Sequence, residues 1–202
     1  VVSQDPALVA GILRLVNTFF FGLSHRITNI EEAVFILGIR QIRELALATP
    51  VIEEMDGFQR SAKGIGIDWS SFWQHSVATA ILTRHLLYLS RRTSGTDSDY
   101  ILGLLHNIGH MVAAALFPER FLSLHEAEPG DAATLVALEQ STYGWDHAQI
   151  GAAFLARHHL PDEIIEPTRH HHQFSHAGEH TLQTAALQLA SIVARSTGIF
   201  CI

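Results

Sequence analysis

Residues 103–111 read GLLHNIGHM, an apolar run broken by two glycines and two histidines. Its apolar residues fit the 3.6-residue period of a helix better than the two-residue period of a strand. His106 and His110 stand one helical turn apart, a spacing that can hold one metal ion, but we favour helix packing or solvent exposure for His110. Asn107 follows His106, at the place where an aspartate would complete a His-Asp metal-binding pair. The stretch therefore predicts a helix and raises the question of whether it belongs to an active site.

Helical periodicity extends over almost the whole chain, and no segment supports a strand. One helix is expected to open at Pro6. Thr28 with Glu31 is a capping pattern for a second helix that ends at Gly38, and a third is expected over about 39–55. Glycines and prolines mark the ends of further helices at 69–91, 98–117, 119–126, 131–143, 146–158, 162–172 and 181–197. The predicted fold class is all-α.

The segment before residue 69 lacks this periodicity and is rich in glycine, which is typical of a linker. We expect one domain over residues 1–202 that contains two packed helical bundles. The N-terminal subdomain is predicted at 1–58, the linker at 59–68 and the C-terminal subdomain at 69–198.

Composition narrows the class of protein. With 202 residues, 48% of them hydrophobic, the chain can bury a substantial core. A net charge of −7, spread along the chain without long acidic or basic runs, argues against nucleic-acid binding. No stretch approaches the ~18 apolar residues of a membrane helix. A single cysteine excludes a disulfide framework and favours a reducing compartment, so we expect a cytoplasmic protein. The chain lacks an initiator methionine and ends on apolar residues, so we expect an excerpt from a longer polypeptide.

Histidine is unusually frequent, with 14 residues dispersed along the chain. Four predicted helices of the C-terminal half carry His75, His106, His147 and the run 170–172 in apolar surroundings. If these helices meet, the imidazoles could form a site for a transition metal. A single histidine is more often a partly buried hydrogen-bond donor. The pair 158–159 is expected to complement a helix end. His176 and His180 are expected in a solvated loop.

Seven motifs occur in an order that resembles the HDOD domain, a bacterial signalling module related in fold to the HD-superfamily phosphohydrolases. They are DPALVAGILRLVNTFFFG (5–22), EEAVFILGIRQIRELAL (31–47), WQHS (73–76), GLLHNIG (103–109), Glu139-x4-Gly144-x2-His147-x3-Gly151, LPDEII (160–165) and the histidine run 170–172. The resemblance covers about residues 5–196. It implies that the C-terminal bundle has an HD-like phosphohydrolase fold.

Catalytic HD domains bind metal through a histidine, a His-Asp pair and a distal aspartate, and the two-metal HD-GYP branch adds further histidines. By this resemblance Asn107 replaces the aspartate of the pair, and Ser191 stands at the best-aligned position for the distal aspartate. The Gly-Tyr-Pro signature is absent after His172. The candidate metal-site residues, as vestigial or low-affinity ligands, are His75, His106, Asn107, His147, His171 and His172.

These replacements favour a protein that is not an enzyme. An aspartate can bridge two metal ions and help hold an activated water, whereas an asparagine is neutral and directs N–H donors at a cation. A site of nearly pure imidazole would bind Mg or Mn poorly. We therefore expect no cofactor, with a transition metal at the histidine cluster as the alternative to a structural role.

The resemblance implies a non-catalytic regulatory or output module in bacterial signal transduction. It would act through protein partners or fused signalling domains, without nucleic-acid or membrane partners. The glycine content of the linker and the two-bundle arrangement add the hypothesis that the linker is a hinge between the bundles. One alternative is a metal-dependent phosphohydrolase of the HD-GYP type that acts on cyclic dinucleotides or nucleotides. Another is a module that senses a ligand or metal without turnover.

Overall fold

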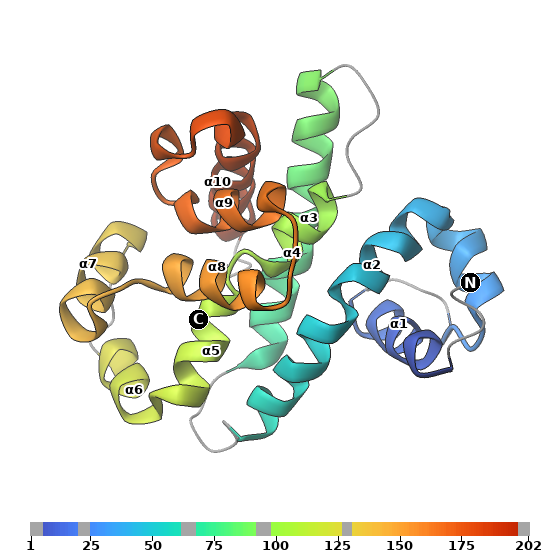
Figure 1. The fold of residues 1–202 in the computed structure, drawn as a ribbon, viewed down its shortest axis with the longest axis horizontal. Coiled ribbons are helices and arrows are strands. Elements are labelled where there is room, and N and C mark those ends of the chain that lie inside the picture. Colours follow the sequence, from blue (N-terminus) through green and yellow to red (C-terminus); the bar gives the residue numbers. More distant parts are fainter. Residues whose placement is uncertain (1–5, 20–24, 62–67, 92–97, 127–130, 198–202) are drawn as a thin grey trace.

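The chain is mostly helical in the part that its computed structural model describes, residues 6–19, 25–61, 68–91, 98–126 and 131–197 (Figure 1). The helices are α1 (Pro6–Phe19), α2 (Ile30–Ser61), α3 (Trp69–Arg91), α4 (Asp99–Leu105), α5 (Ile108–Leu116), α6 (Pro118–Glu126), α7 (Ala132–Tyr143), α8 (His147–Arg157), α9 (Asp162–His170) and α10 (Thr181–Ser196). Two 3-10 turns, η2 (Phe174–His176) and η3 (Gly178–His180), precede α10. These residues contain no strand, so the predicted all-α class is confirmed. None of the described helices is long and apolar enough to cross a bilayer.

Helix α2 changes direction at Gly38, which has a φ of 83° and a ψ of 155°. Glycine adopts a positive φ at little cost, so the predicted helix end at Gly38 is confirmed and a second helical run follows at once. The start of α2 is capped by Asn29, whose Oδ1 accepts a hydrogen bond from the backbone N–H of Glu32 at 2.8 Å. The predicted capping pair of Thr28 and Glu31 is therefore wrong by one residue.

The second run of α2 continues beyond the predicted end near residue 55 and reaches Ser61. Tertiary packing explains this extension, because Met55 is buried and the ring of Phe58 lies 5.7 Å from that of Phe154 in α8. Residues 59–61 of the predicted linker are therefore helical, which corrects that part of the prediction. Residues 62–67 lie outside the described part of the chain, and the subdomain boundaries stay a prediction.

The predicted helix 98–117 is two helices. Helix α4 ends at Leu105, α5 begins at Ile108, and His106 and Asn107 lie at the junction. Asn107 has a φ of −98° and a ψ of 11°, outside the helical range, so the chain turns between the two histidines of the opening motif. The ends of the other predicted C-terminal helices agree within two residues.

One hydrophobic core runs through both bundles. Helices α1 and α2 lie together on one side of the molecule (Figure 1), and α2 also packs against α4 and α5. Buried side chains from the first bundle, such as Ile12 and Met55, belong to the same cluster as Phe72, Leu104 and Leu187 of the second. The N-terminal helices are therefore packed onto the C-terminal bundle through apolar surface.

Helices α5 and α8 approach so closely that their backbones touch at Gly109. A Cβ atom added to Gly109 would collide with the carbonyl oxygen of His147 and would lie 2.8 Å from the backbone nitrogen of Gly151. Only glycine leaves room for this approach. The contact fixes the start of α8, and with it His147, against the turn that carries His106.

Substitution Gly109→Ala tests this contact. Because the clash is with backbone atoms, which cannot rotate away, we expect a loss of about 3 kcal/mol or more in the free energy of unfolding, measured by urea denaturation. Gly57→Ala is the matched control. Gly57 lies in α2 with no atom within 4 Å of an added Cβ, so this variant should gain about 0.5–1 kcal/mol. A Gly109→Ala variant as stable as the wild type would show that the helices are further apart.

Candidate functional site

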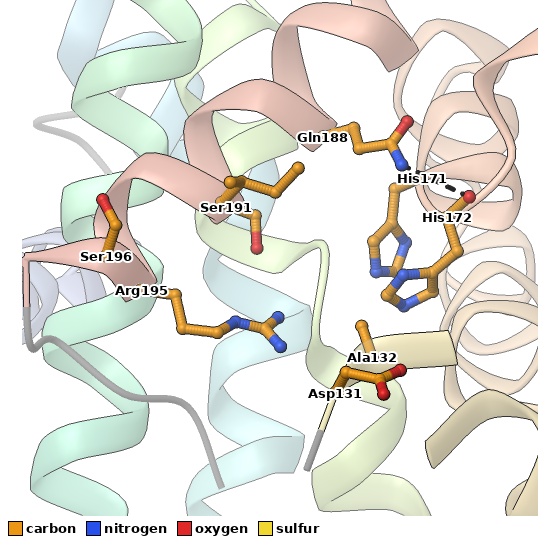
Figure 2. A pocket seen from close by; sticks show the side chains of 9 residues that line it. Asp131, Ala132, His171, His172, Gln188, Ser191, Arg195 and Ser196 are labelled. Atoms are coloured by element: carbon orange, nitrogen blue, oxygen red, sulfur yellow. Dashed lines mark hydrogen bonds between the residues drawn. The ribbon is translucent and has the colours of Figure 1, made fainter. Parts of the chain in front are cut away.

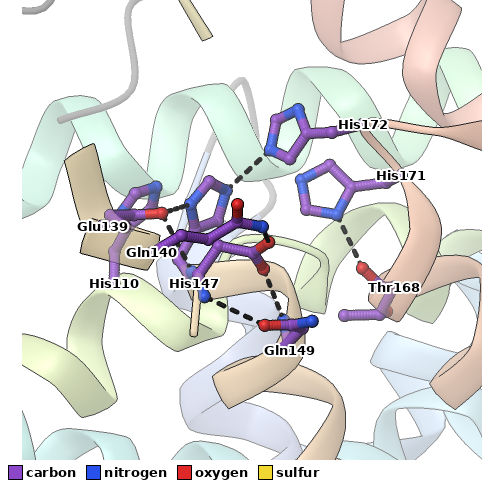
Figure 3. Close-up of polar contacts among 9 residues, drawn as sticks. His110, Glu139, Gln140, His147, Gln149, Thr168, His171 and His172 are labelled. Carbon is purple, nitrogen blue, oxygen red and sulfur yellow. Dashed lines mark hydrogen bonds and ion pairs between the residues drawn. The ribbon is translucent and has the colours of Figure 1, made fainter. Parts of the chain in front are cut away.

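Five histidines from different parts of the C-terminal bundle form one cluster. They are His75 in α3, His106 after α4, His147 at the start of α8, and His171 and His172 after α9. The imidazole centroid of His106 lies 5.6 Å from that of His75 and 5.3 Å from that of His171. The ring of His147 lies 5.4 Å from His171 and 4.8 Å from His172. All are buried except His172, which is partly exposed. Figure 3 shows the part of the cluster around His147.

Two of these imidazoles have a fixed tautomer. The Nδ1 atoms of His106 and His171 lie 2.8 Å from the carbonyl oxygen of Gly103 and 2.7 Å from that of Thr168. A carbonyl only accepts hydrogen bonds, so each Nδ1 carries the hydrogen and each Nε2 presents a lone pair. Both Nε2 atoms are buried and have no hydrogen-bond partner in the described part of the chain.

Burial also keeps these imidazoles neutral. It lowers the pKa of His171 to about 3, with a further contribution from His147. Burial likewise lowers the pKa of His106 well below its ordinary value, and that of His172 as well, because the charged form of each would lose its hydration. Neutral imidazoles with free lone pairs can bind a cation or accept a hydrogen bond from a ligand.

Glu139 is a member of the site that the candidate residues did not include. Its Oε2 accepts hydrogen bonds from the backbone N–H of His147 at 3.0 Å and from Nδ1 of the same residue at 2.6 Å (Figure 3). Its Oε1 lies 3.6 Å from Nδ1 of His110. All three side chains are at most 5% exposed. The expected ligand set of nearly pure imidazole stays a prediction, and the structure adds a buried carboxylate that supports one of its histidines.

The local sequence explains how Glu139 meets His147. Helix α7 ends at Gly144, which has a φ of 84°. Asp146 then starts α8 with a capping box, in which its side chain and that of Gln149 each accept a hydrogen bond from the other's backbone N–H. This short turn directs the first N–H groups of α8 at the last turn of α7. The spacing Glu139-x4-Gly144-x2-His147 is the sequence signal that could have identified Glu139 as part of the site.

His110 is buried, so solvent exposure is excluded as its explanation and the packing alternative holds. Its ring stacks on that of His147 with a centroid distance of 3.9 Å and an interplanar angle of 19°. Lone pairs in two nearly parallel rings do not converge on one ion. We therefore interpret His110, Glu139 and His147 as a hydrogen-bonded and stacked group, although their ligand atoms lie within 4.8 Å of one another.

The group His147, His171 and His172 is the better candidate for holding a metal. Its three ligand atoms lie within 4.8 Å of one another. Glu139 holds the Nδ1 hydrogen of His147, so Nε2 of His147 accepts the hydrogen bond that Nε2 of His172 donates at 2.9 Å. A metal ion would replace this shared proton. Three imidazole nitrogens suit zinc, iron, nickel or copper better than magnesium.

The two positions that lack an aspartate also lie in this region. The hydroxyl of Ser191 in α10 lies 3.3 Å from Nε2 of His75, and the hydroxyl of Thr79 lies 3.5 Å from the same atom. Asn107 is buried at the start of α5, and its backbone carbonyl oxygen accepts a hydrogen bond from the backbone N–H of His110 at 3.0 Å. Ser191, which the resemblance aligns with a metal-binding aspartate, thus places a hydroxyl beside His75.

Four further histidines of the described chain, at 158, 159, 176 and 180, are not members of this cluster. Nε2 of His158, at the end of α8, lies 2.9 Å from a carboxylate oxygen of Glu54 in α2, so this contact joins two helices. His159 follows it with a φ of 57°. His176 is exposed and His180 is partly buried, and both lie in 3-10 turns rather than in an irregular loop.

Replacement of Glu139 tests its supporting role. Glu139→Leu leaves two buried donors of His147 without an acceptor, so we expect a loss of about 3 kcal/mol in the free energy of unfolding. Glu139→Gln keeps one carbonyl oxygen and should cost about 1 kcal/mol. The control Glu163→Gln, at a carboxylate that accepts from Ser98 at 2.7 Å on a more open surface, should change stability by less than about 0.5 kcal/mol. Equal stability of all three variants would contradict the role of Glu139.

Acidification should unfold the metal-free protein. The unfolded histidines bind protons near pH 6.5, whereas His106, His171 and His172 stay neutral in the folded chain down to a lower pH. The unfolded state therefore gains protons first, and stability falls as pH falls below about 6.5. Each histidine should cost about 1 kcal/mol between pH 7 and 5.5, measured by urea denaturation. His171→Asn should reduce this slope, and a slope of zero in the wild type would contradict the buried neutral state.

Comparison with known proteins places this geometry in a family. The chain matches the model of the HDOD domain over residues 1–174. An uncharacterised protein of Treponema pallidum (strain Nichols) is 31% identical over 178 residues, which cover 88% of this chain and 33% of that protein. The chain therefore spans about a third of the length of this curated relative.

Solved structures share the fold. A candidate signal transduction protein from Marinobacter aquaeolei matches with a TM-score of 0.76 and 24% identity, over 98% of this chain and 44% of that one. A candidate phosphohydrolase from Shewanella amazonensis matches with a TM-score of 0.74 and 23% identity, over 98% of this chain and 68% of that one. At such identities the likeness shows the fold alone.

Proposed function

Because the chain belongs to the HDOD family, we propose that it is a regulatory module of bacterial signal transduction that acts through protein contacts and does not hydrolyse phosphate esters. The proposal that the protein does not hydrolyse phosphate esters rests on the hydroxyl of Ser191 beside His75, at the position where the resemblance expects a metal-binding aspartate. The amide of Asn107 replaces the other carboxylate. Without both, an activated water would have little support.

The carboxylates that do lie near the cluster have other partners. Both oxygens of Glu139 face His147 and His110. Asp146 caps α8 through Gln149 and accepts a hydrogen bond from Nε2 of Gln140 at 2.9 Å. Neither group is free to bridge two metal ions without loss of the contacts that hold α7 against α8. This arrangement supports a structural use of the old site.

A role in signalling is supported by the family and by a relative of the same fold, the candidate signal transduction protein of Marinobacter aquaeolei. Contacts with partner proteins or fused domains are supported by exposed apolar side chains. Phe35 is 90% exposed and Ile39 is 65% exposed, on either side of the bend in α2 at Gly38. A partner could cover these side chains. The proposed hinge would have to follow Ser61, because α2 is helical to that residue.

A transition-metal site without turnover is the second candidate, and the preset lone pair of His171 favours it. His147, His171 and His172 would hold the ion, and Glu139 would orient His147. When bound, such a metal supplies a Lewis acid. The runner-up enzyme, an HD-GYP-type phosphohydrolase, would need that metal together with a carboxylate that the cluster does not spare.

Metal analysis combined with a phosphodiesterase assay separates these candidates. We expect no turnover of a cyclic dinucleotide or a nucleotide in Mn, Fe or Mg. One zinc or iron per chain without turnover would favour the metal-sensing candidate, and stoichiometric metal with turnover would overturn the proposal. The variant Asn107→Asp restores a carboxylate and should raise Mn affinity about tenfold or more. The control Asn29→Asp, at the cap of α2 where aspartate caps equally well, should leave Mn affinity unchanged.

A further inference from the structure

A cavity of about 410 Å³ opens between α10, the start of α7 and the end of α9. Its wall includes Arg195, Ser191 and Gln188 of α10, Asp131 at the start of α7, and the two histidines that follow α9, His171 and His172. Figure 2 shows Arg195 and the two imidazoles on facing sides of this space. The volume suits a small polar molecule.

Arg195 brings a positive charge into the cavity without a partner for it. Its Nε is buried and has no hydrogen-bond acceptor, and its guanidinium forms no ion pair in the described part of the chain. Asp131, on the neighbouring wall, instead accepts hydrogen bonds from the backbone N–H and the hydroxyl of Thr134 at 2.9 and 3.0 Å. A guanidinium with a buried, unpaired donor is suited to an oxyanion, which can accept two parallel hydrogen bonds.

The side of the cavity that faces Arg195, where Gln188 of α10 lies beside His172, carries two acceptors without partners. Nε2 of His171 has a lone pair and no partner, because Nδ1 of the same ring donates to Thr168. Oε1 of Gln188 is also buried without a partner, since its amide nitrogen donates to the carbonyl oxygen of His172 at 3.3 Å. A fully ionised oxyanion cannot satisfy these acceptors, and the negative charge of Asp131 further disfavours a dianion.

A ligand that satisfies both walls must carry an anionic oxygen and an O–H group together. We propose that this cavity binds a protonated phosphate, either inorganic phosphate or a phosphomonoester. The ionised oxygens would accept hydrogen bonds from Arg195, and the P–OH group would donate to Nε2 of His171 or Oε1 of Gln188. A phosphomonoester retains a titratable proton near neutral pH, whereas a phosphodiester and sulfate do not.

Such binding would give the regulatory module a small-molecule signal, so the inference deepens the function proposed above. It needs no metal, and a metal on His171 would occupy the same lone pair. Failure of phosphate binding would leave the regulatory role intact, because that role rests on the family and on the absent carboxylates. Turnover in the phosphodiesterase assay would overturn that role without affecting the cavity.

Calorimetric titration of the chelator-treated chain with inorganic phosphate, ribose 5-phosphate and sulfate tests the proposal. We expect phosphate or the ester to bind at least tenfold more tightly than sulfate, which matches phosphate in shape. Binding of the ester alone would identify a phosphomonoester, and binding of phosphate alone the free ion, and either supports the proposal. Equal binding of sulfate, or no binding of any of the three, would overturn it.

Replacements of Arg195 and Gln188 test the part that each side of the cavity plays in binding. Arg195→Gln should weaken binding of the preferred ligand at least tenfold, and Arg157→Gln, at an exposed arginine of α8, should leave it unchanged. Gln188→Leu should reduce the preference for phosphate over sulfate while sulfate affinity stays the same. Thermal midpoints check that each variant folds, and Arg195→Lys, which keeps the charge, should bind more tightly than Arg195→Gln. Binding that ignores both residues would contradict the assignment.

Discussion

The contact between α5 and α8 at Gly109 is the constraint on which the candidate site depends. It is a backbone contact, so no rotation of a side chain can relieve a larger residue there. It sets the first residue of α8 beside the turn after α4, and His147 then meets both Glu139 and His172. The N-terminal helices add apolar surface to the same core. The histidines converge because the backbones beneath them cannot move apart without loss of this packing.

Most helices of the C-terminal half could be predicted from the sequence, because periodicity and glycine or proline breaks mark their ends, and the family resemblance pointed to the histidines that meet in the cluster. What the sequence did not reveal depends on contacts between distant segments. The extension of α2 to Ser61 needs the partner ring of Phe154, although the local sequence is rich in breakers. The break at His106 and Asn107 falls in an apolar stretch where no proline marks it. Helical propensity describes neither.

The same reason explains the missing members of the site. Glu139 reads as one more polar residue on a surface helix until the turn at Gly144 brings it to His147. In the sequence, Arg195 looks like a favourable cation in the last turn of a helix. Only the position of α10 in the fold places this side chain in the wall of a cavity. Ser191 was placed by its resemblance to a ligand position, and it lies beside His75. The motifs identified the histidines, but only the fold shows that the charged side chains of Glu139 and Arg195 lie near them.

The helical run of α2 from Ile39 to Ser61, which contains Pro50, links two distant parts of the molecule. A helix of this length spans up to roughly 35 Å at 1.5 Å per residue. One end stands at the bend that exposes Phe35 and Ile39. Near the other end, the ring of Phe58 contacts that of Phe154 in α8, and Glu54 lies beside His158, which directly follows α8. Helix α8 begins with His147. A partner bound at Phe35 and Ile39 and a molecule bound beside the histidines would therefore contact opposite ends of one unit formed by α2 and α8.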